Sequence, residues 1–358
     1  MYPQFLPLRQ FLPYNIYLFM QQPNLPNNRG CLVGGGAHSA LFYDVISPEN
    51  LLHAWRKFGR GKRNSSEVAA FELRLEENLF SLHERLMQGI WTNDPYIPRR
   101  ISDPKPRLIH IASVRDRVLY QAVYQQLYQI FDKTFIHDSY ASRETKGTHA
   151  GVQRFEVFAK KVSANYRNSS FVLKCDIRKF FDSIDHKLLL FLISKRITDK
   201  NLLALIHRIL SSFETAPYKG LPLGNVTSQI FANIYLNELD QFVKHKLKAK
   251  YYIRYCDDFV IVEKNQEILK TLTQKIRDFV RDKLLLELHP HKVTIRKLRQ
   301  GTDFLGYVSL PHYRVLRTRT KKRMLKRLNE KNLQSYFGML EYCRGDKIRK
   351  VVEKLLAR

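Results

Sequence analysis

The stretch that decides the fold reads Tyr251-Tyr-Ile-Arg-Tyr-Cys-Asp-Asp-Phe-Val-Ile-Val262. Two apolar, β-prone runs flank Asp257 and Asp258, which is the pattern of a β-hairpin with two acids at its tip. Neighbouring carboxylates in a turn repel each other, so they need solvent or a bound cation to offset the repulsion. Asp-Asp pairs are also common in ordinary solvated turns. The hairpin alone therefore does not distinguish such a turn from a cation-binding site.

A second apolar strand also ends in an acid. The run Phe171-Val-Leu-Lys-Cys-Asp176 places a carboxylate at the end of a buried-type strand, where it is costly without a partner. If this strand and the hairpin are neighbours in one sheet, Asp176 and Asp257 meet. They could then hold two Mg²⁺ ions, the arrangement used for in-line phosphoryl transfer.

The composition points to a nucleic-acid partner. The 358 residues include 61 Lys and Arg against 33 Asp and Glu, a formal net charge of +28, which favours polyanions as ligands. The longest apolar run, Leu188–Ile193, is far shorter than the roughly 18 residues of a membrane span. The four cysteines form no CxxC pair typical of a zinc finger. We expect a soluble, cytoplasmic protein that binds no membrane.

The chain changes character along its length. Residues 1–47 are rich in proline and poor in charge, which is typical of an irregular leader or of a start codon placed upstream of the native one. Residues 48–170 combine helical periodicity with two short strands joined by a basic turn, and residues 171–308 mix strands with amphipathic helices. The last 48 residues, Pro311–Arg358, carry 15 Lys or Arg against four acids at helical spacing. We expect this basic tail to contact nucleic acid.

These motifs resemble those of reverse transcriptases. Asp176 matches the first catalytic motif of that family, and Tyr255-Cys-Asp-Asp258 matches its YxDD box. The resemblance implies an α+β, right-hand polymerase: fingers within 48–170, a palm of antiparallel sheet and helices within 171–308, and a basic helical thumb at 309–358. It also implies Mg²⁺ as the cofactor, with Mn²⁺ as a substitute, and dNTPs, template RNA and the RNA/cDNA hybrid as ligands.

The resemblance assigns roles to individual residues. It implies that Asp176, Asp257 and Asp258 are catalytic and bind the metal ions together with the backbone carbonyl of Ile177. Phe181 resembles the steric gate that excludes a ribose 2′-hydroxyl, with core packing as the alternative for it and for Phe180. The residues implied to bind the dNTP are Lys105, Arg107, Phe181, Leu223, Gly224, Gln229 and Lys292. Phe304, Leu305 and Gly306 resemble the primer grip, and Arg117, Arg143 and Lys146 lie in blocks that contact the template RNA. A surface lysine is the alternative for Lys292.

One motif departs from the general family pattern. In Leu221-Pro-Leu-Gly-Asn-Val-Thr-Ser-Gln229, Leu223 stands where most reverse transcriptases have glutamine, and Gln229 stands where they have proline. This pair resembles the reverse transcriptases of diversity-generating retroelements. Leucine offers no hydrogen bond to the incoming nucleotide, and the loss of such a contact costs about 1 to 3 kcal/mol of discrimination. We therefore expect low-fidelity synthesis.

The retroelement resemblance implies further partners and a context. These are a template-repeat RNA, errors at template adenines, a basic accessory variability protein oligomer, and a bacterial, archaeal or phage genome. Two alternatives remain. One is a reverse transcriptase of the group II intron, retron or abortive-infection type, and the other is a non-catalytic RNA-binding protein, which would keep the charge of +28 but lose one of the acids.

Overall fold

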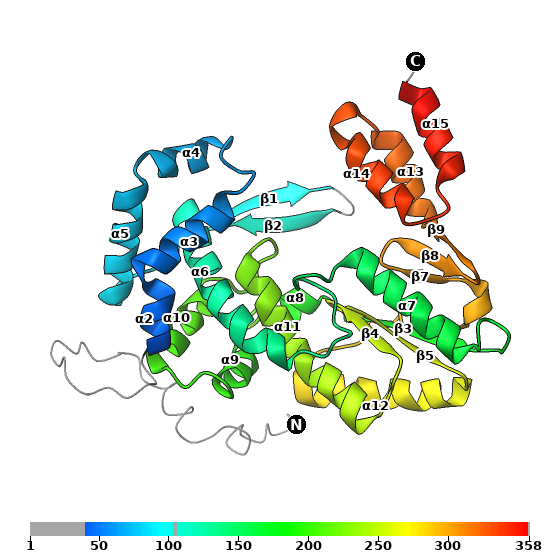
Figure 1. The fold of residues 1–358 in the computed structure, drawn as a ribbon. Coiled ribbons are helices and arrows are strands. Elements are labelled where there is room, and N and C mark those ends of the chain that lie inside the picture. Colours follow the sequence, from blue (N-terminus) through cyan, green and yellow to red (C-terminus); the bar gives the residue numbers. More distant parts are fainter. Residues whose placement is uncertain (1–39, 103–105, 357–358) are drawn as a thin grey trace, which may run out of the picture. The chain divides into compact units, whose positions relative to one another are not determined.

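The computed structural model describes residues 40–102 and 106–356 (Figure 1). They form two compact units, each built from two segments of the chain: 40–130 with 184–228, and 131–183 with 229–356. Residues 131–170, which we expected to belong to the fingers, therefore group with the second unit. Most of the expected leader and Lys105 lie outside the described residues.

The first unit is mainly helical. An antiparallel ribbon of β1 (Ile97–Ile101) and β2 (Arg107–Ile111) confirms the two predicted short strands. The side chain of Ser47 caps α3 by accepting a hydrogen bond from the backbone N–H of Asn50. The helices of this unit are α2 (Ala40–Ile46), α3 (Pro48–Gly59), α4 (Ser66–Leu73), α5 (Leu75–Met87), α9 (His186–Ser194), α10 (Lys200–Ser211) and most of α6 (Val114–Phe131).

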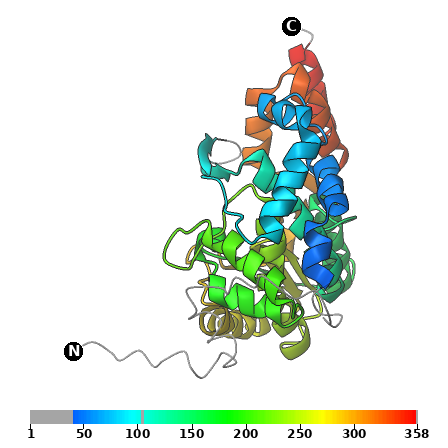
Figure 2. The ribbon, with the colours of Figure 1, turned by 90° about the vertical axis from the view of Figure 1, so that its left-hand side faces the viewer.

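Two expectations about this unit are wrong. The expected irregular leader ends in a helix, α2, because the apolar residues of Ala40–Ile46 pack inward and leave Val45 and Ile46 with no exposed surface. Apolar residues at helical spacing over 68–87 predict one helix, but the structure has two, α4 and α5, because the backbone leaves the helical conformation at Arg74 (φ −124°, ψ 42°). In Figure 2 the blue helices α2 to α5 face the viewer.

A four-stranded antiparallel sheet organises the second unit. Its strands are ordered β4 (Tyr252–Tyr255), β5 (Asp258–Glu263), β3 (Phe171–Asp176) and β6 (Thr294–Lys297). Helix α7 (Thr148–Val162) packs on one face through a cluster of apolar side chains, whose members include Phe155, Phe158, Val172 and Val260. The alternate residues Leu173, Cys175 and Ile261 are equally buried, since α12 (Gln266–Leu284) covers the opposite face. This sheet with its helices confirms the predicted α+β class.

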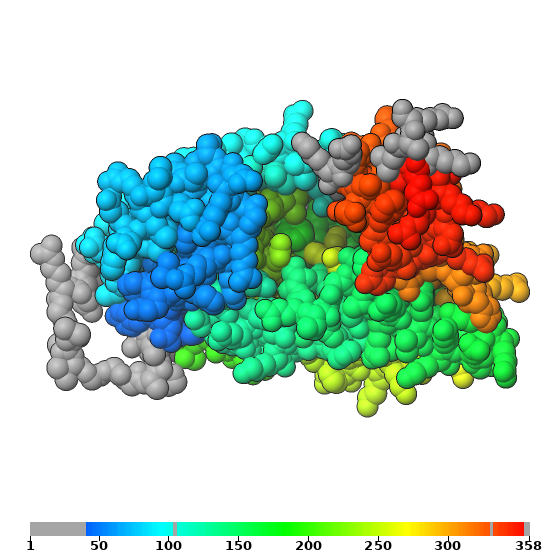
Figure 3. Space-filling view, turned by 45° about the horizontal axis from the view of Figure 1, so that its top comes forward, coloured from blue at the N-terminus to red at the C-terminus, as the bar shows by residue number. Residues whose placement is uncertain are grey.

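The basic tail packs onto the same unit. A second antiparallel sheet, β7 (Thr302–Phe304), β8 (Tyr307–Leu310) and β9 (Tyr313–Leu316), leads into α13 (Thr318–Arg327), α14 (Glu330–Glu341) and α15 (Asp346–Leu356). Met324, Leu340 and Val352 of the three helices share one core with Tyr307 and with Val152 of α7. Lys321, Lys322 and Lys326 of α13 stay exposed, so the tail keeps basic side chains on its surface. Figure 3 draws the tail in orange to red, by residue number.

The remaining elements connect these layers. They are η2 (Asp132–Thr134), α8 (Phe180–Ser183), α11 (Val226–Gln241), η3 (Phe242–Lys246) and η4 (Leu298–Gln300). Among the described residues, no helix has the length and apolar character needed to cross a membrane.

Candidate active site

The three acids singled out by the sequence lie at one end of the four-stranded sheet. Strand β3 pairs with β5, and Asp176 stands directly opposite Asp258 in their register. Asp257 sits in the turn that precedes β5, and its backbone carbonyl accepts a hydrogen bond from the N–H of Ile177 at 3.3 Å. The predicted neighbour relation of the two strands is therefore present, and it brings together acids that are 81 positions apart in the sequence.

The hairpin turn has a constrained backbone. Tyr255 pairs with Asp258, so Cys256 and Asp257 alone form the connection between β4 and β5. Cys256 adopts a positive φ of 55°, which suits a two-residue hairpin but is unfavourable for a residue with a Cβ. A tight turn of this kind holds the Asp257 carboxylate close to the strand end that carries Asp176.

Burial and mutual repulsion raise the proton affinity of two of these acids. Burial raises the pKa of Asp257, and the nearby Asp176 raises it further. Burial also raises the pKa of Asp258 to about 6, against the opposing effect of the ammonium of Lys174. The Oδ1 atom of Asp258 is buried without a hydrogen-bond donor. These carboxylates therefore gain from any cation that comes within reach.

Two lysines offset part of the negative charge. The Nζ of Lys292 lies 3.0 Å from each carboxylate oxygen of Asp176. The Nζ of Lys174 lies 3.4 Å from Oδ2 of Asp258 and donates to the backbone carbonyl of Asp303 at 2.7 Å. The family resemblance implies that Lys292 binds the dNTP, but it assigns no role to Lys174. The signal for Lys174 was a single charged residue two positions before Asp176, hence on the same face of an apolar strand.

The donor atoms suit a hard divalent cation. Asp176, Asp257, Asp258 and the carbonyl of Ile177 all offer oxygen, the ligand that Mg²⁺ prefers. The buried and unpartnered Oδ1 of Asp258 is an acceptor that a cation would satisfy. Across the part of the chain that the structure describes, no three or more His, Cys, Asp or Glu side chains already form a metal-binding group. The residues fit such an ion by chemical type.

The two adjacent phenylalanines have different environments. Phe180 is 2% exposed and belongs to the core, while Phe181 is only partly buried and meets the Phe180 ring edge-on, with the centroids 5.3 Å apart. The alternative of core packing therefore applies to Phe180. Phe181 keeps an accessible ring five residues after Asp176, and its role as steric gate stays a prediction.

The primer-grip segment is a tight hairpin turn. Phe304 is fully buried, and Leu305 (φ 50°) and Gly306 (φ 91°) alone connect β7 to β8. The apolar pattern predicts a strand over 304–308, but the structure turns at residues 305 and 306. A Cβ at Gly306 would meet no described protein atom within 4 Å, and the close approach of a primer at this glycine stays a prediction. The positive φ of the turn is what favours glycine at this position.

Several predicted nucleotide ligands belong to the first unit. Arg107 is the exposed first residue of β2. Leu223 is partly buried, and its carbonyl accepts a hydrogen bond from the N–H of His110 at 3.3 Å. This hydrogen bond joins the segment 221–229, which departs from the family pattern, to β2. Gly224 follows with a φ of 111°. Gln229, where the second unit resumes, is exposed in the first turns of α11. The dNTP-binding roles of these residues stay predictions.

The predicted template contacts differ from one another in accessibility. Arg143 is an anchor of its own loop: its guanidinium donates to Asp132 at 2.6 Å and to the carbonyl of Ile136 at 2.7 Å, and its side chain is 9% exposed. This geometry does not favour a template role for Arg143. Arg117 pairs with Glu67 at 2.6 Å. Lys146 donates to the carbonyl of His137 at 3.0 Å.

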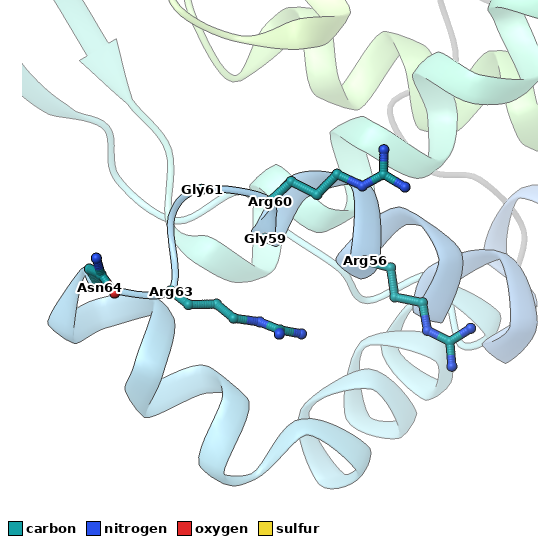
Figure 4. Close-up of a pocket in the computed structure, with 6 residues that line it drawn as sticks. All are labelled: Arg56, Gly59, Arg60, Gly61, Arg63 and Asn64. Carbon is teal, nitrogen blue, oxygen red and sulfur yellow. The ribbon is translucent and has the colours of Figure 1, made fainter.

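A cluster of arginines that the sequence analysis missed lies between α3 and α4. Arg56, Arg60 and Arg63 line a shallow pocket together with Gly59, Gly61 and Asn64 (Figure 4). Arg63 pairs with Glu72 at 3.0 Å. Burial lowers the pKa of Lys62, which lies beside this pocket, and the charge of Arg117 adds to that effect. Such a concentration of positive charge suits a phosphate backbone.

The chain is similar in sequence to known proteins. The sequence model of the family described as reverse transcriptase (RNA-dependent DNA polymerase) matches residues 100–309. The chain is 24% identical to protein YkfC of Escherichia coli (strain K12), over 66% of this chain and 72% of that protein. It is 26% identical to the group II intron-encoded protein LtrA of Lactococcus lactis subsp. cremoris, over 69% of this chain. The chain spans about half of LtrA, 51% of its length.

Solved structures of telomerase are also similar. Apo telomerase from Candida tropicalis matches with a TM-score of 0.48 and 12% identity, over 75% of this chain and 57% of that one. A form truncated from the C-terminal domain matches with a TM-score of 0.46 and 14% identity, over 66% of this chain and 58% of that one.

Proposed function

The chain belongs to the reverse transcriptase (RNA-dependent DNA polymerase) family, and on that premise we propose that it copies an RNA template into cDNA at Asp176, Asp257 and Asp258. One observation carries the proposal: Asp176 faces Asp258 across β3 and β5, while Asp257 occupies the turn between β4 and β5. Its α+β fold is that of a right-hand polymerase. Fingers within 48–170, a palm within 171–308 and a thumb at 309–358 are part of the proposal.

The family generally depends on divalent metal, and we assign Mg²⁺ to this chain. The three acids and the carbonyl of Ile177 would hold the ions, which when bound acidify the primer 3′-hydroxyl and neutralise the departing pyrophosphate. The protein itself supplies position and charge. Lys292 would donate a proton to the leaving pyrophosphate, a role that its contact with Asp176 supports. The ring of Phe181 would exclude a 2′-hydroxyl.

Template RNA binding rests on the basic surfaces. The exposed lysines of α13 and the arginines of the α3–α4 turn offer cations to phosphate without any sequence readout. The net charge of +28 supports the same role. Affinity for RNA should therefore fall steeply as salt is raised.

The finer assignment is to a diversity-generating retroelement. It is supported by Leu223 and Gln229, which stand where most of the family has glutamine and proline. We propose that the enzyme makes adenine-directed errors while copying a template-repeat RNA and works with a basic accessory variability protein. Similarity to the group II intron-encoded protein LtrA favours an intron-type reverse transcriptase as the second candidate.

Primer extension on an RNA template with dNTPs and Mg²⁺, followed by sequencing of the product, tests these proposals. Wild-type extension with substitutions concentrated opposite adenines supports the retroelement type, and accurate product supports the intron type. Asp257→Ala should abolish this synthesis. Its matched control is Asp282→Ala, which removes an exposed carboxylate on α12 and should leave synthesis unchanged. Absence of product, even with a cognate RNA and accessory protein, would favour a non-catalytic RNA-binding protein.

A further inference from the structure

A fully buried ion pair lies beside the catalytic turn. Arg254 of β4 and Asp240 of α11 both have no exposed surface, and their closest atoms, Nη2 and Oδ2, are 2.7 Å apart. The Nε of Arg254 donates to both carboxylate oxygens, at 2.8 and 3.0 Å. The hydroxyl of Tyr252 donates to Oδ1 of Asp240 at 2.7 Å. The guanidinium is thereby locked onto α11 along one edge.

The other nitrogens of the guanidinium reach toward the turn and the surrounding loops. Nη1 donates to the backbone carbonyl of Cys256 at 3.2 Å and to Oδ1 of Asn233 at 3.2 Å. Nη2 donates to Oγ of Ser139 at 3.1 Å. The carbonyl of Cys256 belongs to the peptide group whose N–H is that of Asp257. The arginine therefore contacts the peptide plane from which the Asp257 side chain starts.

That peptide plane needs external support. Cys256 has a φ of 55°, a conformation that disfavours a residue with a Cβ and persists only where its surroundings impose it. On the other side of the turn, the carbonyl of Asp257 accepts from the N–H of Ile177. The two hydrogen bonds hold the two carbonyls of the turn, one from the side chain of Arg254 on β4 and one from the backbone of Ile177, which follows β3.

A buried ion pair is a weak source of stability, because the loss of hydration offsets most of the attraction. Its geometry is nevertheless specific, since the planar guanidinium fixes several acceptors at once and a lysine ammonium cannot reproduce that fork. We propose that Arg254, anchored by Asp240, is a positioning residue that sets the Cys256–Asp257 peptide and so aims the Asp257 carboxylate at the divalent cation. This inference rests on the proposed polymerase function.

The test replaces Arg254 by lysine, which keeps Asp240 neutralised but loses the fork. We expect the Arg254→Lys enzyme to show a kcat about 10- to 100-fold lower, with an unchanged KM for dNTP. We also expect weaker Mn²⁺ binding, by about 3- to 10-fold on the same grounds, in an electron paramagnetic resonance titration without nucleotide. RNA affinity should stay within about twofold, because the phosphate-binding surfaces are untouched.

Ser139→Ala is the matched control. It removes a hydrogen bond from the same guanidinium but not the one to the turn, so kcat and Mn²⁺ affinity should stay at wild-type values. An equal loss in Ser139→Ala would reduce Arg254 to a merely structural role and overturn the proposal. Wild-type kcat and Mn²⁺ affinity in Arg254→Lys would overturn it as well.

A second variant tests the proposal if Arg254→Lys does not fold. Arg254→Met with Asp240→Leu replaces the pair by apolar side chains of similar size, a change that buried ion pairs often tolerate. If this folded double variant polymerises at the wild-type rate, the proposal is overturned; folded protein with reduced kcat and Mn²⁺ affinity supports it. If the wild-type protein itself extends no primer, the proposed function fails, while the Mn²⁺ titration still tests the positioning role.

Discussion

Replacement of Asp258 by asparagine should stabilise the fold while it impairs catalysis. In the folded protein the pKa of Asp258 is raised from its ordinary value of 3.8 to about 6 by burial. At 1.36 kcal/mol per pKa unit, holding this carboxylate ionised at pH 7 costs about 3 kcal/mol. Asparagine removes that cost. The attraction of Lys174 is already contained in that pKa, and Lys174 keeps its hydrogen bond to the carbonyl of Asp303 in the variant.

The expected gain at pH 7 and without divalent cations is therefore about 3 kcal/mol in the free energy of unfolding. A raised folded pKa means that the wild-type fold gains stability when it takes up the proton, and loses that gain as pH rises through 6. One unit below the folded pKa, at pH 5, the wild type recovers about 1 kcal/mol, so the advantage of Asp258→Asn should shrink by that amount.

Urea unfolding of both proteins at pH 7 and pH 5 measures these differences. Asp282→Asn is the control, since hydrogen bonding to Arg281 lowers the pKa of that exposed acid and its neutralisation should bring no stabilisation. Equal unfolding free energies of wild type and Asp258→Asn at pH 7 would refute the reasoning. So would an advantage that does not change with pH.

Three further predictions concern catalysis. Asp257→Ala should lower primer extension by about 1,000-fold or more because it removes a metal ligand, yet leave RNA affinity within about twofold; a loss of RNA binding would contradict the separation of these roles. Leu223→Gln should lower the substitution rate about tenfold by restoring a hydrogen bond to the nucleotide, and an unchanged rate in sequenced product would remove Leu223 from the explanation. Lys174→Met should raise the pKa of Asp258 further, because an opposing positive charge is lost. The acid limb of the pH–kcat profile should then move to higher pH, and a superimposable profile would count against the Lys174 contact.

The acids of the candidate site were predictable from local patterns. A β-prone run that ends in Asp176 and a hairpin that carries Asp257 and Asp258 are visible because apolar and polar residues follow the spacing of strands. Apolar residues at helical spacing predict helices over 187–196 and 266–285, close to the observed bounds of α9 and α12. In contrast, α10 was missed and α2 was taken for an irregular leader. Short helices of this kind depend on packing against neighbours rather than on periodicity.

What the sequence by itself determined is therefore the identity and local setting of the acids and the family to which the chain belongs. Tertiary structure decided which charges meet. The register of β3 against β5 set Asp176 opposite Asp258, and it made Lys174 a partner of an acid 84 positions away. The burial of Arg254 against Asp240 was likewise not readable from either segment alone. The physical reason is that such contacts join distant segments, so they exist only once hydrophobic packing has fixed the sheet register and the placement of α11 against it.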